Sequence, residues 1–291
     1  MSQTPPVVLT IAGFDPSSGA GVTADVKTIA AHGCYGVAAI TAMTVQSTAG
    51  VNKVLPVDPG LLAETLDELV SDMKISAVHI GMLGSGEIAS RVAQFLETAN
   101  PPNVVLDPIL QASSGANLLD EAGVRVLKER LLRLANVITP NVNEATTLSG
   151  IPIHSVEDMA LAAQRLQEMG AQSVVVTGGH LEAAIDLLRE KGQPGQTFRC
   201  HRLPSQNTHG TGCAFSTAIA CHLAQGRSLS AAVLAAKSYV TAAIANAYPV
   251  GKGSGPVNHM YRMKDHLPVA EMAKKEIAGK ETAKQRASGK G

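Results

Sequence analysis

Residues 207–220 read NTHGTGCAFSTAIA, a glycine-rich turn that passes directly into a stretch of small residues. Gly210 and Gly212 flank Thr211, and glycine permits backbone conformations in which a turn exposes its amide groups. From Cys213 onward the spacing of small and apolar residues predicts a helix. The N-terminus of a helix carries free N–H groups and a partial positive charge. The stretch therefore predicts an anion-binding turn at the start of a helix.

Cys213 falls in the first turn of this predicted helix. A helix N-terminus lowers the pKa of a nearby thiol, which makes the thiolate available as a base or nucleophile. A free cysteine among alanine and isoleucine is also typical of a small buried apolar side chain. The position of Cys213 predicts a depressed thiol pKa but leaves a structural and a catalytic role both open.

Composition limits the kinds of partner. The 291 residues suit one large α/β domain or two small ones. Lys plus Arg and Asp plus Glu both total 24, and aromatic residues make up 3%, so neither nucleic acid nor a membrane surface is an expected partner. No apolar run approaches the roughly 20 residues that span a bilayer, and the N-terminal pattern, without a basic segment, argues against a signal peptide. Four widely spaced cysteines without a CxxC pair favour a reducing, cytoplasmic location.

Short apolar runs alternate with helical patterns, and a glycine loop follows nearly every run. This order predicts a mostly parallel sheet covered by helices on both faces. A barrel of eight βα repeats is the competing topology, but hairpin-like pairs near Val51 and Ala183 fit it poorly. The predicted strands are residues 7–12, 37–45, 51–57, 77–81, 104–106, 137–139, 173–177, 183–188 and 196–203.

The first glycine loop, residues 13–21, reads GFDPSSGAG and leads into a predicted helix. The spacing from Gly19 to Ala24 satisfies GxGxxA, the pattern of a dinucleotide-binding loop. Such a site needs an acidic residue about 20 positions further on to hold the ribose. No Asp or Glu occurs between Asp25 and Asp58, so dinucleotide binding ranks second.

Polar side chains gather at predicted strand ends and helix starts: Asp25, Gln46, Asp107, Asn141, Glu144 and Cys213. Carboxylates and amides in such places can hold Mg²⁺, usually through water, next to a phosphate chain. Each also has a structural interpretation: Asp25 as a first-turn helix acid, Asp107 as a turn residue and Glu144 as a solvated helix residue. No GxxxxGK[ST], HExxH or GxSxG motif occurs.

From Val8 to His259 the chain resembles the hydroxymethylpyrimidine and phosphomethylpyrimidine kinases of the ribokinase superfamily. The matching segments include LTIAGFDPSSGAGVTADVKT, KISAVHIGML, VVLDPI, ITPNVNEA, VTGGHLEAAIDLL, NTHGTGCAFSTAIA and GPVNH, in this order. The resemblance implies a ribokinase-like three-layer α/β/α sandwich with a mostly parallel central sheet. It also implies ATP- and Mg²⁺-dependent phosphorylation of 4-amino-5-hydroxymethyl-2-methylpyrimidine, and of its monophosphate, for thiamine biosynthesis.

The resemblance carries residue roles with it. Gly13, Asp25, Gln46 and Met82 are expected around the aminopyrimidine. Gly210, Thr211 and Gly212 are expected to form the anion hole, with Cys213 where most ribokinase relatives carry an aspartate base. Asn141 and Glu144 match the element for phosphates and metal, and Asp107 lies beside it, so Asp107 and Glu144 are the expected metal residues.

The chain departs from the family on the nucleotide side. Many members carry lysine where this sequence has Thr177, Ser113 and Gln206. Lys237 on the last predicted helix is a candidate substitute near the nucleotide, and a surface lysine is the plain alternative. Thr177 and Lys237 are therefore candidate nucleotide-binding residues together with Asn141 and Glu144.

The predicted kinase domain covers residues 1–263, and residues 264–291 form a Lys/Ala-rich tail with the composition of a solvated, disordered segment. A homodimer is expected from the resemblance alone. Two other functions stay open: a pyridoxal or pyridoxine kinase on the same scaffold, and a non-catalytic sensor of the pyrimidine.

Overall fold

The computed structural model describes residues 4–112, 115–179 and 184–266. Its contacts divide the chain into two units, Met1–His259 and Met260–Gly291. In the second unit a 3-10 helix, Tyr261–His266, is described. The predicted tail lies outside the described residues beyond residue 266, and the predicted domain boundary at residue 263 stays a prediction.

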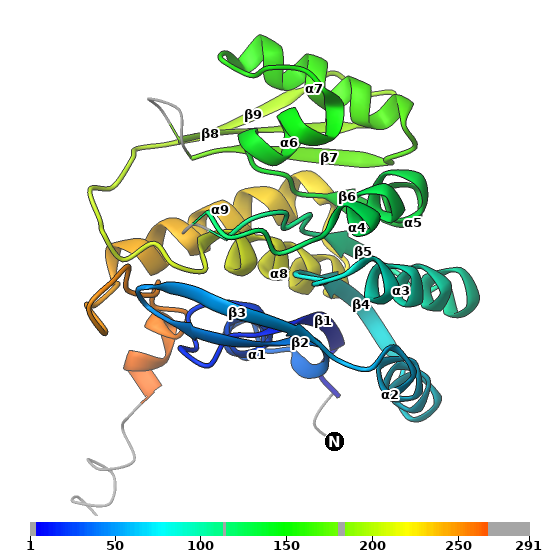
Figure 1. The fold of residues 1–291 in the computed structure, drawn as a ribbon. Coiled ribbons are helices and arrows are strands. Elements are labelled where there is room, and N and C mark those ends of the chain that lie inside the picture. Colours follow the sequence, from blue (N-terminus) through cyan, green and yellow to red (C-terminus); the bar gives the residue numbers. More distant parts are fainter. Residues whose placement is uncertain (1–3, 113–114, 180–183, 267–291) are drawn as a thin grey trace, which may run out of the picture. The chain divides into compact units, whose positions relative to one another are not determined.

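The first unit is built on a nine-stranded sheet within the described residues, in the order β3-β2-β1-β4-β5-β6-β7-β8-β9 (Figure 1). Strands β2, β1, β4, β5, β6 and β7, which are neighbours in this order, run parallel. Strand β3 at one edge and strands β8 and β9 at the other are antiparallel to their neighbours. The mostly parallel sheet predicted from the sequence is confirmed. The strands are β1 Val7–Phe14, β2 Tyr35–Ser47, β3 Gly50–Pro56, β4 Ile75–Ile80, β5 Val104–Leu106, β6 Val137–Ile138, β7 Ser173–Gly178, β8 Ala184–Glu190 and β9 Gln196–Cys200.

Helices form a layer on each face of the sheet, which makes the fold a three-layer α/β/α sandwich. One layer contains α1 Gly21–Ala31, α8 Thr211–Ala224 and α9 Leu229–Ala245. The other contains α2 Pro59–Asp72, α3 Gly86–Ala99, α4 Glu121–Val126, α5 Leu132–Leu134, α6 Val142–Ser149 and α7 Val156–Glu168, with a π-helical segment, Leu127–Leu131, joining α4 to α5. The large apolar core lies between this second layer and the sheet.

Two helix starts follow from their sequence signals. Asp58 caps α2 by accepting a hydrogen bond from the Leu61 amide, and proline opens the helix. Ser155 and Asp158 form a capping box at α7. Helix α8 packs against the sheet, α1 and α9, and every residue from Cys213 to His222 is buried. Its small side chains allow this close packing on several sides.

Strand β2 runs further than its apolar pattern predicts. The predicted strand ends at residue 45, but β2 continues to Ser47 because β3 pairs with it in a hairpin, Gln46 opposite Val51 and Ser47 opposite Gly50. Strand β1 likewise passes through Gly13 to Phe14, where it pairs with Met43 of β2. Gln46 therefore lies on a strand of a hairpin.

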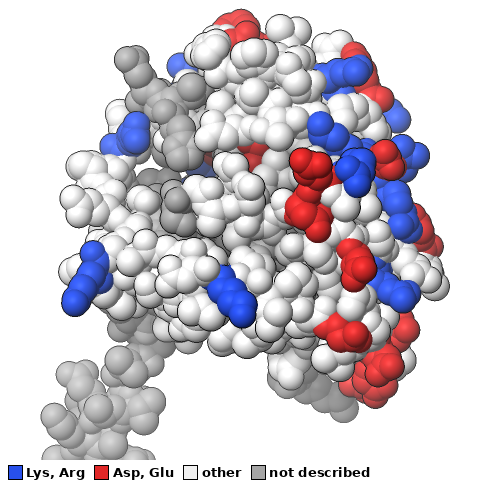
Figure 2. Space-filling model, in the orientation of Figure 1, with Lys and Arg blue, Asp and Glu red and all other residues white. Residues whose placement is uncertain are grey.

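Charge is mixed on the surface. In the view of Figure 2, Lys and Arg side chains intermingle with Asp and Glu along one side. Within the described residues, no helix has the length and apolar character needed to cross a membrane.

Candidate active site

A pocket of about 510 Å³ opens at the carboxyl ends of the parallel strands, where α/β sheets bind ligands. It is bordered by the β2–β3 hairpin, the loop after β5 and the start of α8. Every site residue predicted from the sequence lines it: Gly13, Asp25, Gln46, Met82, Asp107, Asn141, Glu144, Thr177, Gly210, Thr211, Gly212, Cys213 and Lys237. The structure brings these residues together, while their individual roles remain predictions.

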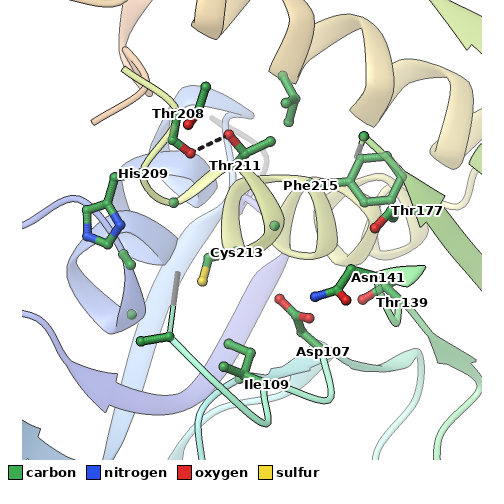
Figure 3. Close-up of a pocket in the computed structure, with 18 of the residues that line it drawn as sticks. Asp107, Ile109, Thr139, Asn141, Thr177, Thr208, His209, Thr211, Cys213 and Phe215 are labelled. Carbon is green, nitrogen blue, oxygen red and sulfur yellow. Dashed lines mark hydrogen bonds between the residues drawn. The ribbon is translucent and has the colours of Figure 1, made fainter. Parts of the chain in front are cut away.

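The glycine turn before α8 requires its glycine. Gly210 is the N-cap of α8 with φ of 81°, in the left-handed region, and a Cβ on it would collide with the carbonyl oxygen of Gly19. Thr211 Oγ1 donates a hydrogen bond of 2.6 Å to the Thr208 carbonyl, which closes the turn (Figure 3). The first amides of α8 have no partner within the helix, so they can bind an anion in the pocket.

We expect Gly210→Ala to impair both folding stability and turnover, because the turn must move to relieve the collision with Gly19. Strain from the left-handed backbone alone costs about 1–2 kcal/mol. Gly226→Ala is the matched control, since Gly226 has φ of 78° and open space around its Cβ position. Thermal unfolding should show a loss of unfolding free energy in both variants. Steady-state kinetics should show a loss of kcat for Gly210→Ala alone. Equal kcat in the two variants would contradict a role of the Gly210 turn in catalysis.

The predicted thiol activation at Cys213 is wrong for the ligand-free protein. Burial raises the pKa of the Cys213 thiol well above its ordinary value, and the nearby carboxylates of Asp107 and Asp25 raise it further. The Gly21 amide acts in the opposite direction but does not prevail. Sequence position suggested a helix-dipole effect, whereas the side chain is 9% exposed and faces two acids. Figure 3 shows Cys213 in the first turn of α8, with Asp107 and Asn141 on one side and His209 on the other.

Glu144 is buried, so its interpretation as a solvated helix residue is wrong. It forms a capping box with Asn141: Glu144 accepts from the Asn141 amide at 2.9 Å, and Asn141 Oδ1 accepts from the Glu144 amide at 3.0 Å. Burial, followed by repulsion from Asp107, raises the pKa of Glu144 to about 8. Burial likewise raises the pKa of Asp107 to about 6, although His79 counteracts this. Both acids therefore hold their protons more tightly than exposed carboxyl groups do.

Asp25 lies at the base of the pocket with no exposed surface. It falls beyond the first turn of α1, so its interpretation as a first-turn acid is wrong. Thr10 Oγ1 donates to one carboxylate oxygen at 2.7 Å and Thr217 Oγ1 to the other at 2.9 Å. Because hydroxyl groups occupy both oxygens, Asp25 supports the floor of the pocket.

On the hairpin side, Gln46 contacts a residue that sequence reasoning missed. Its Nε2 lies 3.4 Å from His209 Nε2, and the same imidazole nitrogen lies 2.9 Å from Asp15 Oδ2. Burial alone would raise the pKa of Asp15, but hydrogen bonds from His209, Ser17 and Ala20 lower it. Both Asp15 and His209 belong to sequence segments that match the family, and this match could have identified them as site residues.

Gly13 and Met82 meet on the same side of the pocket. A Cβ at Gly13 would stand 2.9 Å from Met82 Sδ, so glycine leaves room for the methionine. Both residues lie next to the central strands, Gly13 within β1 and Met82 just after β4.

On the opposite side, Lys237 of α9 is buried, so its interpretation as a surface lysine is wrong. Its Nζ lies 2.7 Å from Asp186 Oδ2, and Asp186 Oδ1 accepts a hydrogen bond from the Gly178 amide. Thr177 and Arg202 line the pocket nearby. Sequence reasoning missed Asp186 and Arg202. Ser113 lies outside the described residues.

Comparisons with known proteins agree with this architecture. A family model described as phosphomethylpyrimidine kinase matches residues 15–258. The chain is 46% identical over 260 residues to a thiamine biosynthesis bifunctional protein, ThiED, of Geobacter sulfurreducens, of which it spans 53%. It is 41% identical to the hydroxymethylpyrimidine/phosphomethylpyrimidine kinase of Aquifex aeolicus, over 85% of this chain and 97% of that protein.

Solved structures of two kinds resemble the chain. A phosphomethylpyrimidine kinase from Clostridium difficile has a TM-score of 0.74 and 37% identity, over 82% of this chain and 99% of that one. The pyridoxal kinase of Staphylococcus aureus, in complex with AMP-PCP and pyridoxal, has a TM-score of 0.82 and 33% identity, over 89% and 96% of the two chains. The ribokinase-like fold implied by the sequence is confirmed. By the extent of the family match and of these identities, the chain belongs to the phosphomethylpyrimidine kinase family.

Proposed function

We propose that the chain transfers the γ-phosphate of ATP to the hydroxyl of 4-amino-5-hydroxymethyl-2-methylpyrimidine, and then phosphorylates the monophosphate to the diphosphate. One observation carries this: a single pocket collects an amide from the hairpin, an anion turn, a thiol at its edge and two facing acids. Relatives named as hydroxymethylpyrimidine/phosphomethylpyrimidine kinases support the substrate. They also support an enzyme over a non-catalytic sensor.

The pyrimidine is expected between the β2–β3 hairpin and α8. Gln46 can both donate to and accept from the ring nitrogen and amino group of an aminopyrimidine. His209, held by Asp15, restricts where the Gln46 amide can lie. Gly13 and Met82 complete an apolar wall beside the ring. This pose directs the hydroxymethyl group towards Cys213 and the anion turn.

The transferred phosphoryl group is expected at the turn of Gly210, Thr211 and Gly212. Phosphoryl transfer depends mainly on positioning and on stabilising negative charge, which backbone amides at a helix start supply. The substrate oxygen attacks the γ-phosphorus while the bond to ADP breaks, and the hydroxyl proton moves to a base. We assign that base to Cys213, whose thiol must first lose its proton.

The facing acids fit a magnesium site. Asp107 and Glu144 are buried oxygen donors whose pKa values are raised mainly by burial, with repulsion from Asp107 as a further cause for Glu144. Magnesium is commonly held by one or two carboxylates together with water and substrate phosphates, which a pair of acids can supply. A magnesium ion there would offset the carboxylate charge and bind phosphate oxygens of ATP. One Glu144 oxygen caps α6, so we expect its contribution to pass through water.

The nucleotide is expected beyond Asn141, along Thr177 and the Lys237–Asp186 pair. Neighbouring kinases described with ADP or AMP-PCP support ATP as the donor. The ion pair with Asp186 holds the Lys237 ammonium inside the pocket. The ammonium can bind phosphate oxygens with its other hydrogens while it keeps its hydrogen bond to Asp186. Arg202 is the cation we add to this set, because it lines the same pocket.

Initial rates with ATP and Mg²⁺ test the proposal, with hydroxymethylpyrimidine, its monophosphate and pyridoxal compared in one preparation. We expect the two pyrimidines to have the highest kcat/KM. The pyridoxal alternative has support from the solved neighbours, several of which are pyridoxal kinases at 33–34% identity. The relatives named as hydroxymethylpyrimidine/phosphomethylpyrimidine kinases reach 42% identity, so we place pyridoxal second. Turnover of pyridoxal alone would overturn the assignment.

We further propose a homodimer through the β2–β3 hairpin. Met43, Val45 and Leu55 are 44–58% exposed, and they share one face because Met43 pairs directly with Leu55. Strand β3 is also the edge of the sheet, where unpaired backbone groups favour association.

The cysteines, Cys34, Cys200, Cys213 and Cys221, are all free thiols, which supports a reducing, cytoplasmic location.

Leu55→Glu should therefore shift the protein from dimer to monomer, because it buries a charge in the apolar face. Light scattering after size exclusion measures the mass directly. Leu161→Glu on α7 is the control, since Leu161 is 54% exposed and lies outside this face. An unchanged mass in Leu55→Glu, or a wild-type monomer, would rule out this interface.

A further inference from the structure

At the floor of the pocket, a fully buried histidine connects two of the acids. His79 lies on β4 with no exposed surface. Its Nδ1 faces Thr10 Oγ1 at 3.2 Å and Asp25 Oδ2 at 3.3 Å. Its Nε2 lies 2.9 Å from Ser216 Oγ on α8, and Ser216 Oγ lies 3.2 Å from Asp107 Oδ2. The chain of contacts runs Asp25, His79, Ser216, Asp107.

Counting hydrogens on the Asp25 side shows that Nδ1 must be a donor. Thr10 has one hydroxyl hydrogen, and its bond of 2.7 Å to Asp25 Oδ2 uses it. The other oxygen of Asp25 already accepts from Thr217. His79 Nδ1 thus faces only acceptors, the Thr10 oxygen and the Asp25 carboxylate.

The Ser216 side offers its hydroxyl hydrogen several acceptors. Besides Asp107 Oδ2, the carbonyls of Gly212 and Cys213 both lie 3.1 Å from Ser216 Oγ. If His79 Nε2 carried no hydrogen, it would compete for the same single hydrogen. If Nε2 carries one, it donates to Ser216, and the hydroxyl of Ser216 is free for Asp107. Donation from both ring nitrogens requires the imidazolium.

The surrounding charges favour that cation. The groups facing His79 are Thr10 of β1, Asp25 of α1, Ser216 of α8 and, further away, Asp107 after β5. Burial alone would lower the pKa of His79, but the charge and hydrogen bond of Asp25, with the charge of Asp107, raise it above its ordinary value of 6.5. A buried charge persists when partners of opposite sign compensate it.

We propose that His79 is a positioning residue that stays an imidazolium in the working enzyme and, through Ser216, fixes the Asp107 carboxylate at the reaction site. The cation also offsets Asp25, one of the acids that, together with burial, raise the pKa of the Cys213 thiol. His79 thereby favours formation of the thiolate without touching substrate. The effect on turnover rests on the proposed kinase function, whereas the charge state of His79 does not.

Nitrogen NMR of the ring tests the charge state in the native protein without an activity assay. The sequence has 9 histidines, and the spectrum of His79→Gln identifies the signals of His79. We expect both ring nitrogens of His79 to be protonated at pH 6, with a pKa above the ordinary value of 6.5. A neutral single tautomer at pH 6 would overturn the proposal, whatever the enzyme turns over.

Kinetics of matched variants test the positioning role. We expect His79→Gln to lower kcat on the order of 10- to 100-fold, as outer partners of catalytic-site ligands do, with little change in the pyrimidine KM. His79→Lys, which keeps a cation, should recover most of kcat. His154→Gln on the exposed surface should match the wild type. An equal kcat and pH profile in His79→Gln and wild type would contradict the role, as would a failure of His79→Lys to exceed folded His79→Gln.

Discussion

Cys213→Ala is expected to lower kcat by about 10²- to 10⁴-fold, the range of a lost general base. The pyrimidine KM should change little, because Gln46, Gly13 and Met82 form the expected ring contacts. Cys213 is in the first turn of α8, beside the amides that would hold the transferred phosphate. Alanine leaves the turn and the helix in place while removing the group that takes the proton.

The raised pKa of Cys213 also predicts how kcat depends on pH. Since the thiol is protonated at neutral pH in the ligand-free protein, wild-type kcat should rise with pH as more thiolate forms. Cys213→Asp should recover part of the lost rate, because a carboxylate can serve as base in the same place. Cys34→Ala, which removes a buried thiol outside the pocket, is the control. Wild-type turnover by Cys213→Ala would refute the assignment.

Glu144→Gln should have opposite effects on turnover and on the stability of the metal-free protein. Turnover is expected to fall on the order of 10- to 100-fold, because the variant removes half of the acid pair expected to support the metal. The capping geometry survives, since glutamine can accept the same hydrogen bond from the Asn141 amide. Any change in stability therefore reports the charge.

The direction of the stability change follows from the pKa values. Glu144 titrates at about 8 in the folded protein and at 4.5 when unperturbed, so the folded state holds the proton more tightly. Between these values the free energy of unfolding falls by about 1.4 kcal/mol for each unit of rising pH. Glu144→Gln removes this loss, so its Tm should match the wild type near pH 4.5 and exceed it increasingly towards pH 8.

Thermal unfolding without Mg²⁺ at a series of pH values measures this difference. Each kcal/mol corresponds to about 2–4 °C in a domain of this size. Glu157→Gln at the exposed start of α7 should show no such pH-dependent gain. If the Tm difference between wild type and Glu144→Gln stayed the same at every pH, Glu144 would have the same pKa in the folded and unfolded protein. That result would contradict the prediction.

Local signals in the sequence were sufficient for most of the fold. Apolar runs identified the parallel strands, and Asp58, Ser155 and Asp158 marked helix starts correctly because capping depends on neighbouring residues alone. The extension of β2 to Ser47 was not predicted, since it depends on pairing with β3 across the hairpin. A strand's apolar pattern ends where burial ends, not where its hydrogen bonds end.

The members of the site were also predictable, but their electrostatic environments were not. The resemblance indicated Cys213 and Glu144, and Lys237 was a candidate for a cation that the family pattern lacks here; all three line the pocket. Their burial and their charged neighbours come from distant segments: Asp107 beside Cys213, and Asp186 beside Lys237. The His79–Ser216 contact spans 137 positions, and no local pattern indicates it. Position suggested the chemistry, whereas packing sets the pKa values.

Phosphorus NMR of the reaction products tests the central claim most directly. The purified protein would be incubated with ATP, Mg²⁺ and equal amounts of hydroxymethylpyrimidine and pyridoxal. We expect a pyrimidine monophosphate signal that gives way to the paired signals of the diphosphate, before appreciable pyridoxal phosphate forms. Pyridoxal phosphate as the first or sole product, or ATP left intact beside both substrates, would rule out the proposed pyrimidine kinase.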